Sequence, residues 1–271
     1  SAFALEYAVL LAVAGSEVAY ATTEQRFLPA LDTDVAALAR QFLEDLGIAV
    51  HEGATVEGGD QASIRLRRID GDIVVPAEVV VAADPRVPFL DGLELDKAGI
   101  SADGAIPVDR RCRTNVPGIY AAGDVTGGHM LSSAAMHMGD VAGRNAAGDD
   151  ALTRLAVVPH VLHTIPETAW VGMTEDQARA AGHDVVIGAA DLSYNAFAVT
   201  RGFRVGGVKL VAERRLGQVL GVHAAGPGAA EVVAVAAALM QAEVALDDLA
   251  AMVHWHPGGA ESIVEAARRA R

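Results

Sequence analysis

His256 and Glu261 are the residues of this sequence whose types and spacing best suit acid–base chemistry. They lie in the string HWHPGGAESIVEAARRA, residues 254–270, with Pro257 directly after the histidine. A histidine held by a carboxylate exchanges protons near neutral pH. Thiol–disulfide exchange needs such a group, because the proton of the leaving thiol has to be held and released. The string therefore predicts a dyad in which Glu261 accepts a hydrogen bond from one ring nitrogen of His256.

Two other interpretations of this string stay open. His256 could simply cap the helix that Glu261 opens. A zinc site built on His254 and His256 is a weaker hypothesis, since the two histidines are two residues apart and no third or fourth ligand follows. We therefore predict no metal site. Gly258 and Gly259 give the loop before the helix extra conformational freedom.

A second string with chemical potential is PGIYAAGDV, residues 117–125. It predicts a strand whose carboxyl end carries Gly123 and Asp124. A carboxylate in that place can bind a ligand hydroxyl, while the glycine lets the backbone approach the ligand closely. Taken alone, the string is equally consistent with an ordinary turn at the end of a strand.

The sequence holds one cysteine, Cys112, in the string RRCRTN. One cysteine cannot form an intramolecular disulfide or supply a redox-active pair. We interpret Cys112 as an ordinary small side chain. A single cysteine fits a reducing compartment, and we expect a cytoplasmic location.

The charge and the composition exclude several partners. The chain carries 21 basic and 35 acidic residues, a formal net charge of −14, so we expect it to bind neither nucleic acid nor an anionic membrane surface. Its apolar stretches are too short to span a bilayer. Hydrophobic residues make up 52% of the chain and aromatic residues only 4%, which favours helices of small aliphatic residues packed on sheets.

The first part of the chain predicts an α/β domain with a mostly parallel sheet and an antiparallel insertion. Asp70-Gly71 predicts a two-residue hairpin turn. The continuously apolar run AEVVVAA, residues 77–83, predicts a buried strand. The other expected elements are helices at 2–14 and 32–46, and strands at 17–21, 48–53, 63–69 and 72–76.

The second part of the chain follows a different pattern. Residues 85–116 are irregular, a helix is expected at 131–147, and residues 148–154 form a linker. After residue 157, strands and helices occur in blocks, which is typical of an α+β domain. The expected strands are 158–164, 184–193, 206–213 and 217–225, and the expected helices are 174–181, 227–241, 246–251 and 259–270.

Taken together, these strings resemble the flavoprotein disulfide reductases, above all the dihydrolipoamide dehydrogenases. TNVPGIYAAGD is similar to the segment in which that family returns to its FAD domain. HTIPETAWVGMTEDQARAAG, residues 163–182, is similar to the start of its dimerisation domain, and Thr174 stands where a helix N-cap is needed. The spacing from His256 to Glu261 resembles its acid/base dyad. The resemblance covers nearly the whole chain.

The resemblance implies roles for residues around two cofactors. Asp124, beside Gly123, would bond the ribitol chain of FAD, and the helix start from about Leu131 to Ala135, which includes Ala134, would lie under the flavin. The first residues, SAFALE, resemble the end of a Gly-x-Gly-x-x-Gly fingerprint for NAD or NADP.

In this fingerprint, Ser1 takes the second glycine position and Ala4 the third, and Glu6 matches a glutamate that often follows. Thr22 stands where NAD-specific relatives have an acid, and no basic cluster marks a 2′-phosphate. The choice between NAD and NADP stays open.

The resemblance also implies an organisation and an activity. Residues 1–84 would form an NAD(P)-binding domain lacking its first strand, residues 85–150 a return segment of an FAD domain, and residues 151–271 an interface domain that pairs two copies into a homodimer. The enzyme would move electrons between NAD(P)H and a small-molecule or protein-bound disulfide or dithiol. His256, aimed by a cis bond to Pro257, would serve the dithiol of the opposite subunit. An N-terminal region with the rest of the FAD domain and a cysteine pair would precede this chain.

Two alternatives remain at this point. The chain could be a flavin-free dimeric module that binds a partner or a nucleotide, although such a module has no use for the dyad. It could also belong to an NAD(P)H oxidase or a metal-ion reductase on the same scaffold.

Overall fold

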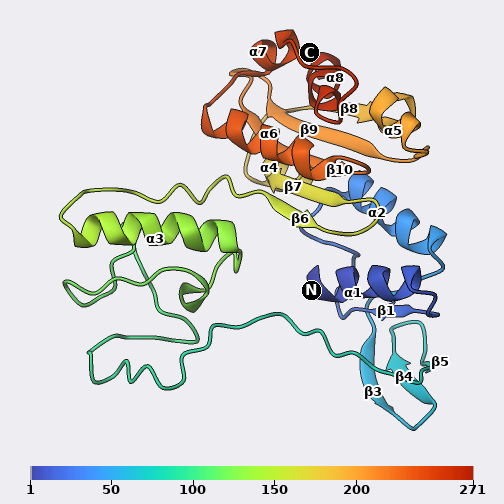
Figure 1. Cartoon of the computed structure of the whole chain (residues 1–271), viewed down its shortest axis with the longest axis horizontal. Coiled ribbons are helices and arrows are strands. Elements are labelled where there is room, and N and C mark those ends of the chain that lie inside the picture. Colours follow the sequence, from blue (N-terminus) through green and yellow to red (C-terminus); the bar gives the residue numbers. More distant parts are fainter. Residues whose placement is uncertain (1, 271) are drawn as a thin grey trace. The chain divides into compact units, whose positions relative to one another are not determined.

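The computed structural model describes residues 2–270, which form two compact units (Figure 1). Residues up to Ala83 and residues from Pro159 onward make one unit, and Asp84–Val158 make the other. Ser1, at the second glycine position of the predicted fingerprint, lies outside the described residues, as does Arg271.

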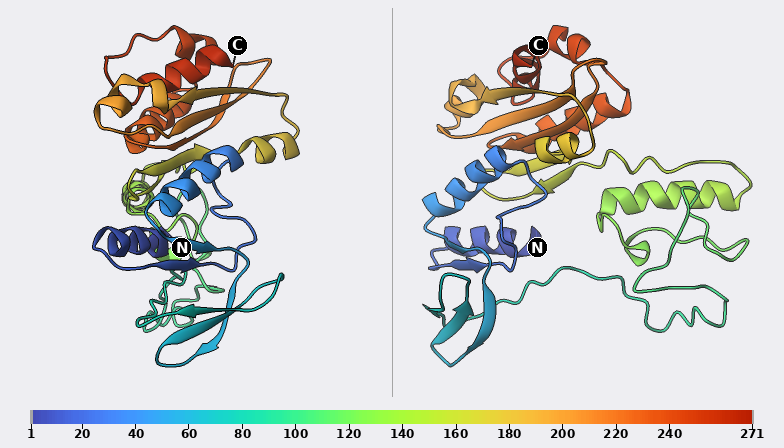
Figure 2. Two further views of the ribbon diagram at one scale, coloured as in Figure 1. Left: turned by 90° about the vertical axis from the view of Figure 1, so that its right-hand side faces the viewer. Right: turned by 180° about the vertical axis from the view of Figure 1, so that it is seen from behind.

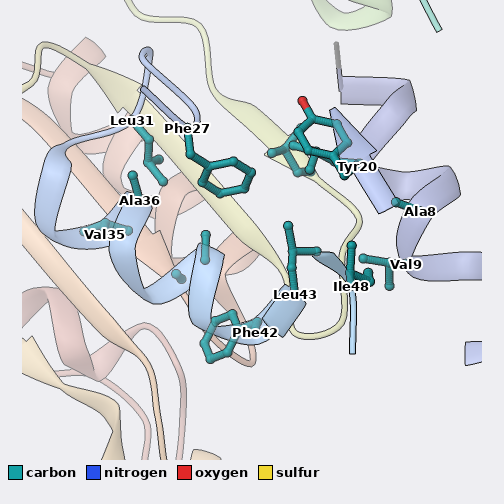
Figure 3. Close-up of a cluster of buried hydrophobic side chains, with 14 residues drawn as sticks. Ala8, Val9, Tyr20, Phe27, Leu31, Val35, Ala36, Phe42, Leu43 and Ile48 are labelled. Carbon is teal, nitrogen blue, oxygen red and sulfur yellow. The ribbon is translucent and has the colours of Figure 1, made fainter. Parts of the chain in front are cut away.

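The N-terminal part is built from two helices and a parallel strand pair. Helix α1 (Ala2–Val13) precedes β1 (Ala19–Ala21), and helix α2 (Thr33–Asp45) precedes β2 (Ala49–His51). Strands β1 and β2 pair in parallel, as the alternation of strands and helices predicts. Figure 3 shows their shared core, in which buried side chains from both helices, from β1 and from the segments that precede α2 and β2 meet, among them Val9, Tyr20, Phe27, Leu31, Phe42, Leu43 and Ile48.

A separate antiparallel sheet follows, made of β3 (Thr55–Gly59), β4 (Ser63–Arg67) and β5 (Ile73–Pro76). The predicted hairpin is therefore present, but its turn is longer than two residues. Residues 68–72 connect β4 to β5, and the backbone N–H of Gly71 bonds the carbonyl of Arg68 at 3.3 Å. Strand β3 was not predicted, because TVEGG contains two glycines and every residue of it is exposed.

The buried strand predicted at residues 77–83 is wrong. These residues form no strand, and Val79, Val80 and Val81 are 79%, 62% and 55% exposed. A buried parallel strand needs hydrogen-bonding neighbours and a cover on both faces. Within residues 2–270, no strand pairs with this segment, so its apolar pattern alone does not make it a strand.

Residues 84–158 are mostly irregular and are organised by one helix. Helix α3 (Ser132–Ala146) packs Met138 and Val141 against the buried Cys112. The strand predicted at 117–124 is wrong. Gly118 has a φ of 80°, and the N–H of Ile119 bonds the carbonyl of Val116 at 3.1 Å, so the chain turns where a strand would have to run straight.

The C-terminal part is an antiparallel sheet covered by helices, which confirms the predicted α+β pattern. Its strand order is β6-β7-β10-β9-β8. The strands are β6 (His160–Leu162), β7 (Thr168–Gly172), β8 (Val185–Asp191), β9 (Gly207–Glu213) and β10 (Val219–Ala225). The helices are α4 (Glu175–Ala180), α5 (Ala196–Thr200), α6 (Ala229–Gln241), α7 (Leu246–Ala251) and α8 (Glu261–Arg269). Neither β7 nor α5 was predicted.

Helices cover both faces of this sheet (Figure 2). Helix α6 packs on β7 and β10 and helix α8 on β8 and β9, while α2 packs on β9 and β10. Gly188 permits the close approach of α8, because a Cβ at this position would lie 1.9 Å from the carbonyl oxygen of Ala266. Among residues 2–270, no helix is both long enough and apolar enough to cross a lipid bilayer.

An ion cluster around the buried side chains of Lys209 and Asp32 joins α2 to the sheet. Nζ of Lys209 lies 2.8 Å from Asp32, 2.7 Å from Asp34 and 2.8 Å from Glu175. Burial alone would raise the pKa of Asp32, but the hydrogen bonds from Lys209 and from the backbone of Glu175 outweigh it and lower that pKa. Burial acts to lower the pKa of Lys209, yet its carboxylate partners raise it. The cluster thus favours the ionised forms of Asp32, Glu175 and Lys209.

Candidate acid/base dyad and cofactor pocket

The predicted dyad is assembled in the loop between α7 and α8. Nδ1 of His256 lies 2.8 Å from Oε2 of Glu261, and the His256–Pro257 bond is cis, both as predicted. The side chain of His256 is 67% exposed and that of Glu261 is 14% exposed. A carboxylate at Nδ1 selects the tautomer in which the other ring nitrogen, Nε2, is free to take up a proton. The pair therefore has the form of an oriented general base that faces outward.

Glu261 is held by its helix and by one further side chain. It is the first residue of α8, which Gly188 lets approach the sheet closely. The amide nitrogen of Asn195 donates to Oε1 of Glu261 at 3.0 Å and so leaves Oε2 for His256. Sequence reasoning missed Asn195. It stands 66 positions before Glu261, and its local pattern indicates only the N-cap of a short helix, which it also is.

His254 lies beside the same carboxylate. Its Nδ1 lies 3.3 Å from the carbonyl oxygen of Trp255 and 3.7 Å from Oε2 of Glu261. In the part of the chain that the structure describes, no group of three or more His, Cys, Asp or Glu side chains is arranged to hold a metal ion. The indole of Trp255, which is 67% exposed, lies over Gly258, where a Cβ would come within 3.0 Å of the ring.

The residues that we expect around FAD lie together in the unit of residues 84–158. Gly123, Asp124, Leu131 and Ala134 line one pocket with a volume of about 180 Å³. This is smaller than the roughly 300–1,000 Å³ of pockets that enclose a whole drug-sized ligand, so these residues would hold only part of a dinucleotide. Oδ2 of Asp124 lies 3.6 Å from a guanidinium nitrogen of Arg86.

The local backbone explains why this pocket is open. Gly123 has a φ of 80°, and the hydroxyl of Thr126 donates to its carbonyl at 2.7 Å, which turns the chain into the short 3-10 helix Asp124–Thr126. A Cβ at Gly123 would lie 3.2 Å from the Cβ of Ala135. A side chain here would therefore crowd the start of α3. The fit is consistent with a hydroxylated ligand lying along the glycine backbone, beside the carboxylate of Asp124.

The two N-terminal candidates, Ala4 and Glu6, lie in α1 and make structural contacts. Ala4 is half-buried and packs against the core cluster of the N-terminal part. Oε1 of Glu6 accepts a hydrogen bond from the backbone N–H of His163 at 2.9 Å. Thr22 accepts one from the N–H of Glu24 at 3.2 Å. Glu6 therefore connects α1 to the segment before β7. None of these contacts distinguishes NAD from NADP.

Cys112 is buried, and its environment is not that of a reactive thiol. Its Sγ lies 3.5 Å from the carbonyl oxygen of Met138. Burial, with a smaller effect of the nearby Asp109, raises the pKa of the thiol. This agrees with our interpretation of Cys112 as an ordinary small side chain.

Two family models match this chain. The model of the pyridine nucleotide-disulphide oxidoreductases matches residues 1–139, and the model of the dimerisation domain of the same family matches residues 158–267. The dyad lies within the second match and the pocket around Asp124 within the first.

Curated relatives are similar over nearly the whole chain. The dihydrolipoyl dehydrogenase of Bacillus subtilis (strain 168) is 38% identical over 264 residues, which are 96% of this chain and 58% of the relative. The mitochondrial dihydrolipoyl dehydrogenase of Pisum sativum is 34% identical over 261 residues, which are 93% of this chain and 52% of the relative. The chain thus spans somewhat more than half the length of these relatives.

Solved structures with the same fold include LpdA of Mycobacterium tuberculosis. It is 28% identical with a TM-score of 0.87, and the match covers 99% of this chain and 59% of that one. The HOCl-induced flavoprotein disulfide reductase RclA of Escherichia coli is 24% identical with a TM-score of 0.87, which shows the likeness of fold alone. That match covers 100% of this chain and 63% of that one.

Proposed function

The chain belongs to the pyridine nucleotide-disulphide oxidoreductase family, and we propose that it serves an FAD-dependent enzyme that moves electrons between NAD(P)H and a disulfide or dithiol. The observation that carries this proposal is the contact of 2.8 Å between His256 and Glu261 in an exposed loop. The curated relatives are named dihydrolipoyl dehydrogenases, which supports a dithiol substrate, free or bound to a protein.

We assign the parts of the chain to this activity as follows. Residues 1–84 bind the NAD(P), and Ala4 and Glu6 belong to its site at the start of α1. Residues 85–150 complete an FAD domain, and residues 151–271 pair two copies of the chain into a homodimer. A cytoplasmic location belongs to the same proposal, since the single cysteine fits a reducing compartment.

In the proposed site, His256 handles the proton of the thiol chemistry. Reduction of a disulfide takes up two electrons and two protons, which one hydride and one proton supply. A thiolate is the reactive form in the exchange, so a base has to hold the proton that the thiol loses and return it to the leaving sulfur. Glu261 accepts at Nδ1 of His256, and Nε2 is the atom that holds this proton.

The pocket around Gly123 and Asp124 would hold part of the FAD. The carboxylate of Asp124 accepts from a ligand hydroxyl, while Leu131 and Ala134 offer apolar contact at the start of α3. When bound, the flavin would supply the electron transfer between the nicotinamide and the sulfur atoms.

Two measurements test this function, made on the purified enzyme with the N-terminal region that the resemblance implies. We expect a flavin absorbance band in the visible range and oxidation of NADH or NADPH that depends on an added disulfide such as lipoamide. Oxidation that proceeds with oxygen or a metal ion alone, unchanged by the disulfide, would place the protein with the oxidases or metal-ion reductases. Absence of both flavin and turnover would leave a binding module and refute the proposal.

A further inference from the structure

We propose that Asn195 is a positioning residue for the dyad and makes Glu261 select His256 rather than the neighbouring His254. The effect on geometry is a property of this chain itself. Its consequence for turnover rests on the function proposed above.

Both polar atoms of the Asn195 side-chain amide make hydrogen bonds. The side chain is buried, with 7% of the residue exposed. Its nitrogen donates to Oε1 of Glu261 at 3.0 Å and to the carbonyl oxygen of Gly258 at 3.3 Å, and its oxygen accepts from the N–H of Ala198 at 3.2 Å. Only a primary amide supplies two donors and an acceptor in so small a volume. Asn195 is therefore hydrogen-bonded to α5, to the loop that contains Gly258, and to the start of α8.

The hydrogen bonds of Asn195 restrict the conformational freedom of the two glycines before α8. Gly258 and Gly259 separate His256–Pro257 from the helix. Two adjacent glycines allow several backbone conformations, so by themselves they would not fix the position of the His256 ring. The carbonyl of Gly258 is held by Asn195, and that of Gly259 by the buried hydroxyl of Ser262 at 2.6 Å. Both ends of the flexible pair are thus hydrogen-bonded to buried side chains.

The hydrogen bond from Asn195 also determines which of two histidines binds the carboxylate of Glu261. Oε2 of Glu261 lies 2.8 Å from Nδ1 of His256 but also 3.7 Å from Nδ1 of His254. A carboxylate free to rotate could offer an oxygen to each ring. Because Asn195 binds Oε1, only Oε2 remains for the histidines, and the rotation that Asn195 imposes brings it to His256. Loss of the amide should therefore loosen the orientation of the ring.

The test compares Asn195→Ser with Asp191→Ser. Serine keeps a helix-capping oxygen at position 195 but is too short to reach Glu261. Asp191 caps the preceding turn through the N–H of Ser193 at 2.8 Å, so Asp191→Ser makes a matched change in the same segment without touching the dyad. Asn195→Thr, which also keeps a capping oxygen, serves as a second variant if the serine variant folds poorly.

The primary readout is the ¹⁵N spectrum of the histidine rings, with His256 assigned by comparison with His256→Gln. We expect His256 in the unaltered protein and in Asp191→Ser to carry its proton on Nδ1, and in Asn195→Ser to populate both tautomers. In the active enzyme, Asn195→Ser should also slow disulfide turnover by about 10–100-fold, the scale of a misplaced catalytic group.

An unchanged His256 spectrum in a folded Asn195→Ser or Asn195→Thr protein would overturn the proposal. A shift of tautomer in a protein that has no disulfide activity would support the positioning role and refute only the function proposed above. The two ideas can thus fail separately.

Discussion

At the scale of single residues, Lys209 gives the sharpest prediction for stability. Its side chain is only 8% exposed and contacts three carboxylates, of which Asp32 is itself buried. Lys209→Met should lower the free energy of unfolding by about 3–5 kcal/mol, because it leaves Asp32 charged and unpaired in the interior. Urea denaturation at pH 7 measures this change.

The matched control for Lys209 is Lys97→Met. Lys97 pairs with Glu94 on the surface, and both side chains are more than 60% exposed. Exposed pairs contribute roughly 0–1 kcal/mol, so this variant should unfold almost like the unaltered protein. Equal midpoints for the two variants would contradict the role of Lys209.

The same cluster predicts how stability depends on acid. Hydrogen bonds from Lys209 hold the pKa of Asp32 and of Glu175 below their usual range, although burial alone would raise that of Asp32. A carboxylate with a lowered pKa in the folded state contributes stability that is full above its unfolded pKa of about 4, and that is lost as the pH falls through the folded value.

We therefore expect the free energy of unfolding to fall as the pH is lowered below about 4, and to fall less steeply in Lys209→Met. Denaturation curves recorded from pH 7 to pH 3 test this. Parallel pH profiles for the two proteins would show that the cluster does not govern the acid response.

Residue-scale prediction from sequence worked where the partners are near in the chain. His256 and Glu261 are five positions apart, and their contact forms as predicted. Asn195 could not be found in the same way, because its capping role is visible locally while its bond to Glu261 crosses 66 positions. Gly123 and Asp124 could be selected by type, but the pocket that they share with Leu131 depends on the fold around them.

At the scale of elements, Gly188 decides how α8 meets the sheet. A Cβ at Gly188 would lie 1.9 Å from the carbonyl oxygen of Ala266, which belongs to the backbone of α8. Gly188→Ala should therefore push the helix away and cost about 1–3 kcal/mol, as overpacking of a filled interior does. The midpoint of urea denaturation, followed by circular dichroism, measures the cost.

Gly143→Ala is the control, because a Cβ at Gly143 would meet no other atom. Gly143 lies in α3, is exposed, and has open space where its Cβ would stand. Alanine should stabilise this helix by roughly 0.5–1 kcal/mol. Slower hydrogen exchange in α3 would show the gain. A loss of protection there, or a stabilising Gly188→Ala, would contradict the packing described above.

Elements with their own caps and periodicity were predictable from sequence. Helix α4 carries a capping box in which Thr174 and Gln177 bond each other's backbone N–H groups, so its start could be placed at Thr174. The segments 77–83 and 117–124 were predicted as strands and are not, because a strand depends on neighbours that lie elsewhere in the chain. The short helix α5 was missed because its five residues, Ala196–Thr200, are too few for an apolar period to show.

At the scale of the whole molecule, pairing of two copies is the main prediction. Among the described residues of 151–271, several large apolar side chains remain exposed, including Tyr194 at 87%, Leu216 at 66%, Val253 at 96% and Trp255 at 67%. The dimerisation-domain model matches the region that carries them. Light scattering at micromolar concentration should give twice the mass of one chain. A monomeric mass would refute the homodimer.

The fold class could be predicted from sequence because the alternation of elements changes once, near residue 157. Helix α6 shows a limit of that reasoning. Its apolar composition requires burial, and Val232, Val233 and Ala236 are covered within one chain. The sheet of its own domain covers these side chains. Composition alone does not show whether an apolar helix is covered by its own domain or by a second copy of the chain.

The most direct test of the proposed function separates the two half-reactions in the flavin-containing protein by rapid mixing. In His256→Ala, reduction of the flavin by NADH or NADPH should proceed at the rate of the unaltered protein, since this step needs no thiol proton. Electron exchange between the flavin and the dithiol should slow by about 10²–10⁴-fold, the usual loss on removing a general acid or base. Flavin content should not change. Exchange with the dithiol within a few-fold of the unaltered rate would contradict the acid/base role of His256 and leave it as a residue that only orders the start of α8.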